Sequence, residues 1–162
     1  MAQRNSGELG QNLFLIAQRL LNNKNLCKYL KYTDNNPLNH PDVEKPMENI
    51  LHKNIKIVPL VNVEENSTES TIAIVFEGVQ LNEDNTEFND VRMKILVYTP
   101  LREWQINDIN LRPFIIISEI EKSLKERRIE GLGKIKYHGF ELELLTADMS
   151  GYRLDFTFDV FS

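Results

Sequence analysis

The sequence has little cysteine and no long hydrophobic run. Its one cysteine, Cys27, excludes an intrachain disulfide, which fits a reducing compartment such as the cytoplasm. The apolar stretch Leu13–Ala17 is too short for a signal peptide, and no stretch of the chain approaches the length of a membrane span. We therefore expect a protein that folds in the cytoplasm and has no membrane partner.

An excess of basic residues is also missing. The formal net charge is −5, with 19 lysines and arginines against 24 aspartates and glutamates. Because tight phosphate binding requires a basic surface, this balance disfavours a protein that grips nucleic acid. The same charge balance is compatible with a protein that nucleic acid passes without binding to it.

Known catalytic motifs are absent as well. The sequence has no G-x-S-x-G turn and no H-E-x-x-H pattern, and Gly131-Leu132-Gly133 lacks the remainder of a phosphate-binding loop. Cys27 lies among Leu26, Tyr29 and Leu30 without an adjacent base, which is typical of a buried thiol rather than a nucleophile. We therefore expect no catalytic residues, no cofactor and no enzymatic activity.

The tripeptide His40-Pro41-Asp42 matches a motif of J-domain co-chaperones, but the proline-rich segment before it cannot form the helix which that domain requires. His40, Asp42 and Glu44 could in principle bind zinc. Their spacing fits no known zinc motif, and a chance cluster in a polar loop explains it better. We predict a proline turn without a metal.

Composition places the chain among ordinary globular proteins. Its 162 residues are 41% hydrophobic and 27% charged, enough for one domain that buries roughly 70% of its unfolded surface. No repeat or low-complexity tract divides it. We predict a single domain over residues 1–162, with residues 1–7 polar and loosely held.

Apolar residues at helical spacing predict two main helices. The first runs from about Glu8 to Leu21 and is followed by a short helix over 26–32. The second main helix spans about 111–128, with Pro113 in its first turn and glycines after its end. Its expected apolar stripe is Phe114, Ile117, Ile120 and Leu124, and its expected solvated residues are Glu119, Lys122, Glu126 and Arg127.

Alternating residues predict about five strands. Three of them, Ile55–Val61, Thr71–Val79 and Val91–Thr99, are expected to form an antiparallel meander. Apolar residues change parity across His138-Gly139, which predicts a bulge or a tight turn within 135–144. Asp148–Gly151 is expected to be a turn before the final strand, Tyr152–Val160. The predicted class is α+β: a twisted, mainly antiparallel sheet of about five strands, with the N-terminal helix and the long amphipathic helix packed on it.

Two acidic loops and one long loop are the candidate contact regions. The acidic loops contain Glu64, Glu65 and Glu69 in the first, and Glu83, Asp84, Glu87 and Asp90 in the second. The segment 33–47 contains Pro37, Leu38 and His40, and long loops without secondary structure often make contacts. Trp104 is either an interface anchor or a plug over the edge of the core.

The order and spacing of these features resemble the tail terminator, or tail completion, proteins of tailed bacteriophages, and small α+β proteins elsewhere in the head-to-tail connector. The segments that carry the resemblance are Asn12–Leu21, Lys28-Tyr29-Leu30-Lys31-Tyr32, Asn36-Pro37-Leu38, Tyr98-Thr99-Pro100, Trp104, Ile117–Leu124, Gly131-Leu132-Gly133 and Tyr152-Arg153-Leu154-Asp155-Phe156.

The resemblance implies a virion structural protein of the tail or neck. Such proteins form a ring, usually of six subunits, that caps the tail tube and docks to the connector. The implied partners are further copies of the chain, the tail tube protein, neck proteins and DNA that passes through the lumen without specific binding. Acidic loops that face the lumen would repel phosphate. Two alternatives stay open: another neck, connector or baseplate component, and a small hydrolase or ligand-binding domain.

Overall fold

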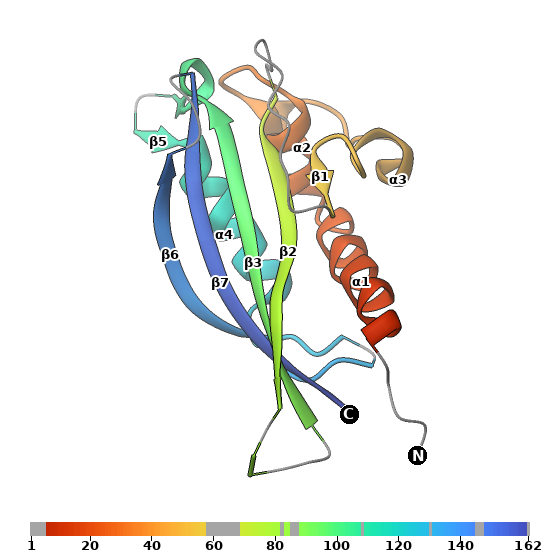
Figure 1. Cartoon of the computed structure of the whole chain (residues 1–162). Coiled ribbons are helices and arrows are strands. Elements are labelled where there is room, and N and C mark those ends of the chain that lie inside the picture. The colour runs from red at the N-terminus through yellow and green to blue at the C-terminus, as the bar shows by residue number, and fades with distance from the viewer. Residues whose placement is uncertain are drawn as a thin grey trace.

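A five-stranded sheet forms the centre of the fold (Figure 1). The computed structural model describes residues 6–57, 69–81, 83–84, 88–107, 109–129, 131–144 and 148–161. The strands of the main sheet follow the order β1-β2-β3-β7-β6, and β4 and β5 form a separate small hairpin. The strand bounds are β1 Ile55–Lys56, β2 Thr71–Leu81, β3 Phe88–Pro100, β4 Gln105–Ile106, β5 Asn110–Leu111, β6 Lys136–Leu144 and β7 Met149–Phe161.

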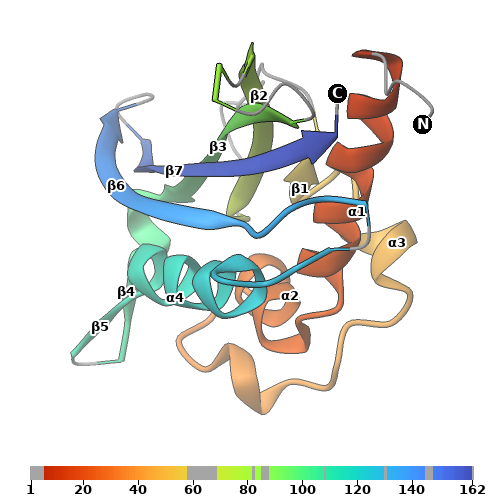
Figure 2. The same ribbon diagram turned by 90° about the horizontal axis from the view of Figure 1, so that it is seen from below.

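The helices lie on one face of this sheet, as the view from below shows (Figure 2). α2 and α4 lie under the strands, and α1 lies towards the β1 side. The helix bounds are α1 Leu9–Leu21, α2 Lys24–Lys31, α3 Pro46–Asn49 and α4 Arg112–Leu124, with 3-10 turns η1 Ser6–Glu8, η2 Pro37–Asn39 and η3 Leu101–Glu103. The expected α+β class, five-stranded sheet and N-terminal helix are confirmed. The expectation for residues 1–7 falls mostly outside the described residues.

Strand alternation explains why the sheet has one apolar face. In β3, the buried residues Val91, Met93, Ile95 and Val97 share a face with Leu154, Phe156 and Phe158 of β7, their cross-strand neighbours. Ile16 and Leu20 of α1, Leu26 and Leu30 of α2, and Ile116 and Ile120 of α4 complete the core on that side. The opposite face carries residues such as Arg92, Lys94, Arg153 and Asp155. The core therefore lies between the sheet and the helices.

The expected three-strand antiparallel meander is wrong at its first strand. β1 pairs with β2 in parallel, with Ile55 opposite Ile72, whereas β2 and β3 are antiparallel. Two neighbouring parallel strands need a connection of about a dozen residues or more. Residues 57–70, which connect β1 to β2, are 14 residues long. The later part of the first predicted strand, 58–61, lies outside the described residues. The predicted bulge is confirmed by a shift of register between Tyr137 and Gly139.

Helix α4 ends at Leu124, earlier than the predicted end near 128. The backbone then forms hydrogen bonds with the chain that leads into β6: Glu126 N donates to Ile135 O, and Ile135 N donates to Arg127 O. These long-range bonds replace further helical bonds. Glu119, expected to be solvated, is buried at 6% exposure, because Asn23 at the start of α2 packs there and donates to its carboxylate and its carbonyl.

Arg112 joins α4 to the rest of the helical layer. Its side chain is 1% exposed, and its guanidinium donates to four backbone carbonyls, those of Tyr29, Tyr32, Asp34 and Glu103, over 2.6–2.9 Å. Burial lowers the pKa of this guanidinium, whereas nearby Glu103 and Asp34 raise it. Pro113 follows in the first turn of α4, where its missing N–H costs no helical bond. The start of α4 is thereby fixed to the end of α2.

Replacing Arg112 with lysine is expected to lower the free energy of unfolding by on the order of 2–4 kcal/mol. The planar guanidinium of Arg112 donates to four backbone carbonyls that lie in different directions. The single ammonium of a lysine cannot reach all four, so some of these buried carbonyls lose their hydrogen-bond donor. Chemical denaturation would measure the effect. Arg92→Lys, on the exposed face of the sheet, is the matched control and should change stability little. Equal effects of the two substitutions would contradict the assigned role.

Gly151 lies within β7 rather than in the turn expected over 148–151. It pairs with Tyr98 of β3, and a Cβ atom at this position would collide with the backbone carbonyl of Val97. The lack of a side chain therefore lets the two strands approach closely, and β7 begins at Met149.

We expect Gly151→Ala to destabilise the protein by at least about 3 kcal/mol, because the backbone of the central strand must shift. Gly10→Ala is the control: Gly10 lies in α1 with no atom within 4 Å of an added Cβ. This second change should stabilise the protein by roughly 0.5–1 kcal/mol through helix propensity. Thermal unfolding of both variants tests the pair, and a Gly151→Ala protein as stable as wild type would refute the close approach.

Candidate interaction surfaces

An exposed cluster of apolar side chains lies where α4 meets the β6 edge of the sheet. Phe114 of α4 packs against Tyr152 of β7 and Phe140 of β6, with ring centroids 5.1 and 6.0 Å apart. Phe140 and Tyr152 lie 5.3 Å apart. Phe114 and Phe140 are 41% and 42% exposed, and Leu142 is 57% exposed. We call Phe114, Phe140, Leu142 and Tyr152 the open-edge patch.

Strand β6 is the last strand of the main sheet, as Figure 1 shows, and it pairs only with β7 among the strands that the structure describes. A strand in this position presents unpaired backbone N–H and C=O groups on its outer side. The edge of β6 therefore combines free backbone hydrogen-bonding groups with apolar side chains, which is typical of a surface that another chain covers.

The outer face of β6 carries an excess of negative charge. The guanidinium of Arg153 lies 2.9 Å from a carboxylate oxygen of Glu141, 3.4 Å from one of Asp155 and 4.0 Å from one of Glu143. Arg153, Glu141, Glu143 and Asp155 form a group that we call the Arg153 cluster. It contains one positive charge and three carboxylates, so its formal charge is −2. Because these groups are partly exposed, the pairs contribute little to stability, and the excess charge is available to a partner.

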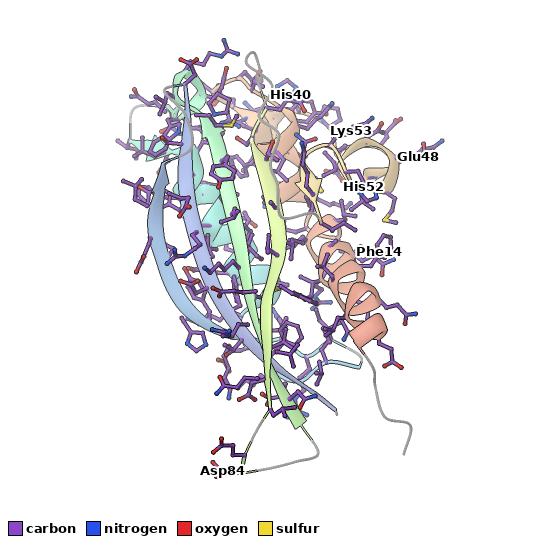
Figure 3. All side chains as sticks on the ribbon, in the orientation of Figure 1. Phe14, His40, Glu48, His52, Lys53 and Asp84 are labelled. Carbon is purple, nitrogen blue, oxygen red and sulfur yellow. The ribbon has the colours of Figure 1, made fainter. Side chains whose placement is uncertain are left out.

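The opposite margin of the sheet is formed by α1, α3 and β1. Figure 3 shows Phe14, Glu48, His52 and Lys53 along this margin, on the side away from β6. Met47 of α3 is 46% exposed. Lys45 pairs with Glu48, whereas Lys53 and Lys56 form no ion pair within the described part of the chain. We call residues 44–56 the α3–β1 margin.

The open-edge patch was not predicted from the sequence, whereas the candidate contact segment 33–47 includes the start of the α3–β1 margin. Phe140 and Leu142 alternate with Glu141 and Glu143, which is the pattern of any half-buried strand. That pattern cannot show that β6 is an edge strand, because strand order is not encoded in it. The one available signal of an exposed apolar surface was the pair Phe140 and Leu142, which lie near the end of β6 on its helix-facing side.

Trp104 lies beside the open-edge patch. It is half-buried after η3, its indole N–H donates to the carbonyl of Thr99 at 2.9 Å, and its ring lies 6.1 Å from that of Tyr152. Through Tyr152 it therefore borders the open-edge patch, and the choice between an interface anchor and a plug over the core edge stays a prediction.

The two acidic loops lie at opposite ends of β2. Glu69 precedes β2 and accepts hydrogen bonds from Lys31 and Asn54. Glu83 and Asp84 are exposed beyond the other end of β2, and Figure 3 shows Asp84 at that tip. Asp90 lies within β3 opposite Asp159 of β7. Burial of the Asp159 carboxyl and its hydrogen bond with the Asp90 side chain raise the pKa of Asp159. Glu64, Glu65 and Glu87 lie outside the described residues.

The segment around His40 forms a small ordered unit. Pro37 is buried, Leu38 is exposed, and His40 stacks on Tyr32 with ring centroids 4.2 Å apart. The imidazole of His40 lies 2.6 Å from a carboxylate oxygen of Asp34. The segment is thus tied to the end of α2.

Asp42 forms ion pairs with two lysines of α2. Its carboxylate pairs with Lys24 at 2.8 Å and with Lys28 at 3.2 Å. The hydrogen bonds from these two lysines lower the pKa of Asp42. Within the described residues, no group of three or more His, Cys, Asp or Glu side chains is arranged to hold a metal ion.

A shallow hollow of about 480 Å³ lies at the end of α4 and is lined by Ser118, Glu121, Lys122, Lys125, Glu126 and Arg127. Its lining mixes both charges and has no nucleophile–base pair. In the described ranges, no helix is both long and apolar enough to span a membrane.

The comparisons with known proteins add one finding. The family model described as YomW matches residues 23–158, most of the chain. This family takes its name from a gene product of an SPBc2-like Bacillus phage, which indicates a phage protein. No curated protein matches the chain. The expected resemblance is thereby supported at the level of phage origin, and the role in the tail stays a prediction.

Cys27 has the properties of a buried thiol. It is 1% exposed, and burial raises its pKa to about 11 from an ordinary value of 9.0. A raised pKa in the folded state means that Cys27 contributes stability below pH 9, and that this stability is lost as the pH rises towards 11. We expect the free energy of unfolding to fall over this range, and to fall less in Cys27→Ala. Denaturation at a series of pH values measures both, and identical slopes would contradict the assignment.

Proposed function

The chain belongs to the YomW family, and we propose that it is a virion structural protein that acts as a tail terminator. In this role it forms a ring on the end of the tail tube and joins the tube to the head-to-tail connector. DNA passes through the lumen. The proposal rests on the phage origin of the family and on one surface of the molecule.

The open-edge patch is the observation that carries the proposal. A single-chain domain of this size rarely exposes several large apolar side chains together without a partner. Here Phe114, Phe140 and Leu142 adjoin an edge strand with unpaired backbone groups. Subunit packing in a ring would cover the patch and satisfy that edge.

The acidic tip of the β2–β3 hairpin has a role in the same proposal. Glu83 and Asp84 are exposed there. If this tip borders the lumen, its negative charge repels the phosphates of passing DNA and prevents sticking. Glu69, which is bound to Lys31 and Asn54, contributes less to such a surface.

Imaging by negative stain and analytical ultracentrifugation test the proposal, with the purified protein alone and with isolated phage tail tubes. Rings, or protein bound at tube ends, are expected. Leu142→Ser should weaken assembly roughly tenfold or more, because truncation of a central interface residue costs at least about 2 kcal/mol. Leu81→Ser, which removes an exposed leucine at the far end of β2, is the control and should assemble normally.

The outcome has clear alternatives. Binding to the portal side or to the baseplate instead of the tube end would assign the protein to another part of the virion. If the protein stays monomeric at high concentration and does not bind tail tubes, a structural role in the tail is refuted.

A further inference from the structure

We propose that the open-edge patch and the Arg153 cluster of one subunit dock against the α3–β1 margin of a second copy of this chain. The inference deepens the proposed function and rests on it, since it names the two surfaces that would join neighbouring subunits. Three observations support a second copy as the partner: complementary charge, exposed apolar residues on both surfaces, and their location at opposite margins of one sheet.

The charges of the two surfaces have opposite signs. The Arg153 cluster carries −2, because Arg153 alone balances Glu141, Glu143 and Asp155. The α3–β1 margin carries three lysines against two glutamates, a formal charge of +1 with His52 neutral. Within this margin, Lys45 pairs with Glu48, whereas Lys53 and Lys56 form no ion pair with any described residue, so both are available to the carboxylates of a neighbour.

Each surface also presents apolar side chains beside its charges. On the β6 side these are Leu142, Phe140 and Phe114, on the helix-covered side of the edge strand, whereas Glu141 and Glu143 of the Arg153 cluster point to its other side, so that a partner seated along the edge meets both. On the other side Met47 is 46% exposed, and half-buried Phe14 of α1 borders the margin in Figure 3. An apolar centre with charges beside it is the usual composition of a protein interface.

Like charge disfavours the simplest alternative, a symmetric pairing of two β6 edges. In that dimer the Arg153 clusters, each with a charge of −2, would lie close to one another. A contact between opposite margins avoids this repulsion. Such a contact is heterologous: each added subunit leaves one margin free, so assembly continues until a ring closes or a filament extends. The charges of the single chain therefore favour a head-to-tail assembly over a symmetric dimer of β6 edges, and ring closure is what the proposed function adds.

Cysteine cross-linking tests the contact. In the variant Leu142→Cys/Lys53→Cys, a short bismaleimide should join neighbouring subunits into a covalent ladder that extends beyond dimers. Each single variant alone should give no ladder. A mixture of the two single variants should stop at covalent dimers, because each subunit then carries one reactive margin. Cys27 remains in all proteins, and the unsubstituted chain should not cross-link, since that thiol is buried.

Leu81→Cys/Lys53→Cys is the matched control for random collisions, because Leu81 is exposed but lies at the end of β2. Three results would overturn the inference: an equal ladder in this control, a covalent dimer from Leu142→Cys alone, or no ladder from the first pair. A charge exchange gives a second measurement. Glu141→Lys/Glu143→Lys should weaken assembly at least severalfold, and adding Lys53→Glu/Lys56→Glu to the same chain should restore it.

The inference and the proposed function fail in different ways. If rings form on tube ends but cross-linking gives no ladder, the role in the tail is supported and the two proposed contact surfaces are wrong. A ladder from a protein that never binds tubes would keep the contact between copies and reject the tail role.

Discussion

The fold depends on how one buried arginine holds the helical layer together. Arg112 stands at the first residue of α4 and donates hydrogen bonds to carbonyls at the end of α2, in the following loop and in η3. A buried charge is costly unless it is fully hydrogen-bonded, so these four acceptors and the guanidinium require one another. They fix where α4 begins, and α4 in turn places Phe114 beside Phe140 and Tyr152.

The one-sided packing of the sheet determines which surfaces remain for partners. Helices cover the face formed by Val91, Ile95 and Phe156, whereas the other face carries ion pairs such as Lys94 with Glu77. The two margins of the sheet differ in both charge and shape. The difference in charge between the margins is the basis for the proposed head-to-tail contact between copies. The proposed ring depends on that difference, and it requires no catalytic or metal site.

Much of the fold could be predicted from local patterns. Alternation in Tyr152–Val160 identified β7, the change of parity near His138 identified the bulge, and helical spacing identified α1 and α4. The errors have a common origin. Glu119 was assigned to solvent although Asn23 covers it, and Gly151 was assigned to a turn although Val97 requires a glycine there. Both depend on residues far away in the chain. Of the candidate site residues, Trp104 alone adjoins the open-edge patch, because strand order decides which apolar residues stay exposed.

The sequence by itself determined the α+β class, the single buried thiol, the helix and strand periods and the absence of known catalytic motifs. These properties depend on neighbours within a few residues, where periodicity and composition act. Only the tertiary structure decided that β1 runs parallel to β2, that β6 lies at an edge, that Arg153 lies near three carboxylates, and that Lys53 has no ion pair with any described residue. Each of these depends on contacts between distant segments, and burial and charge balance exist only after those segments have packed together.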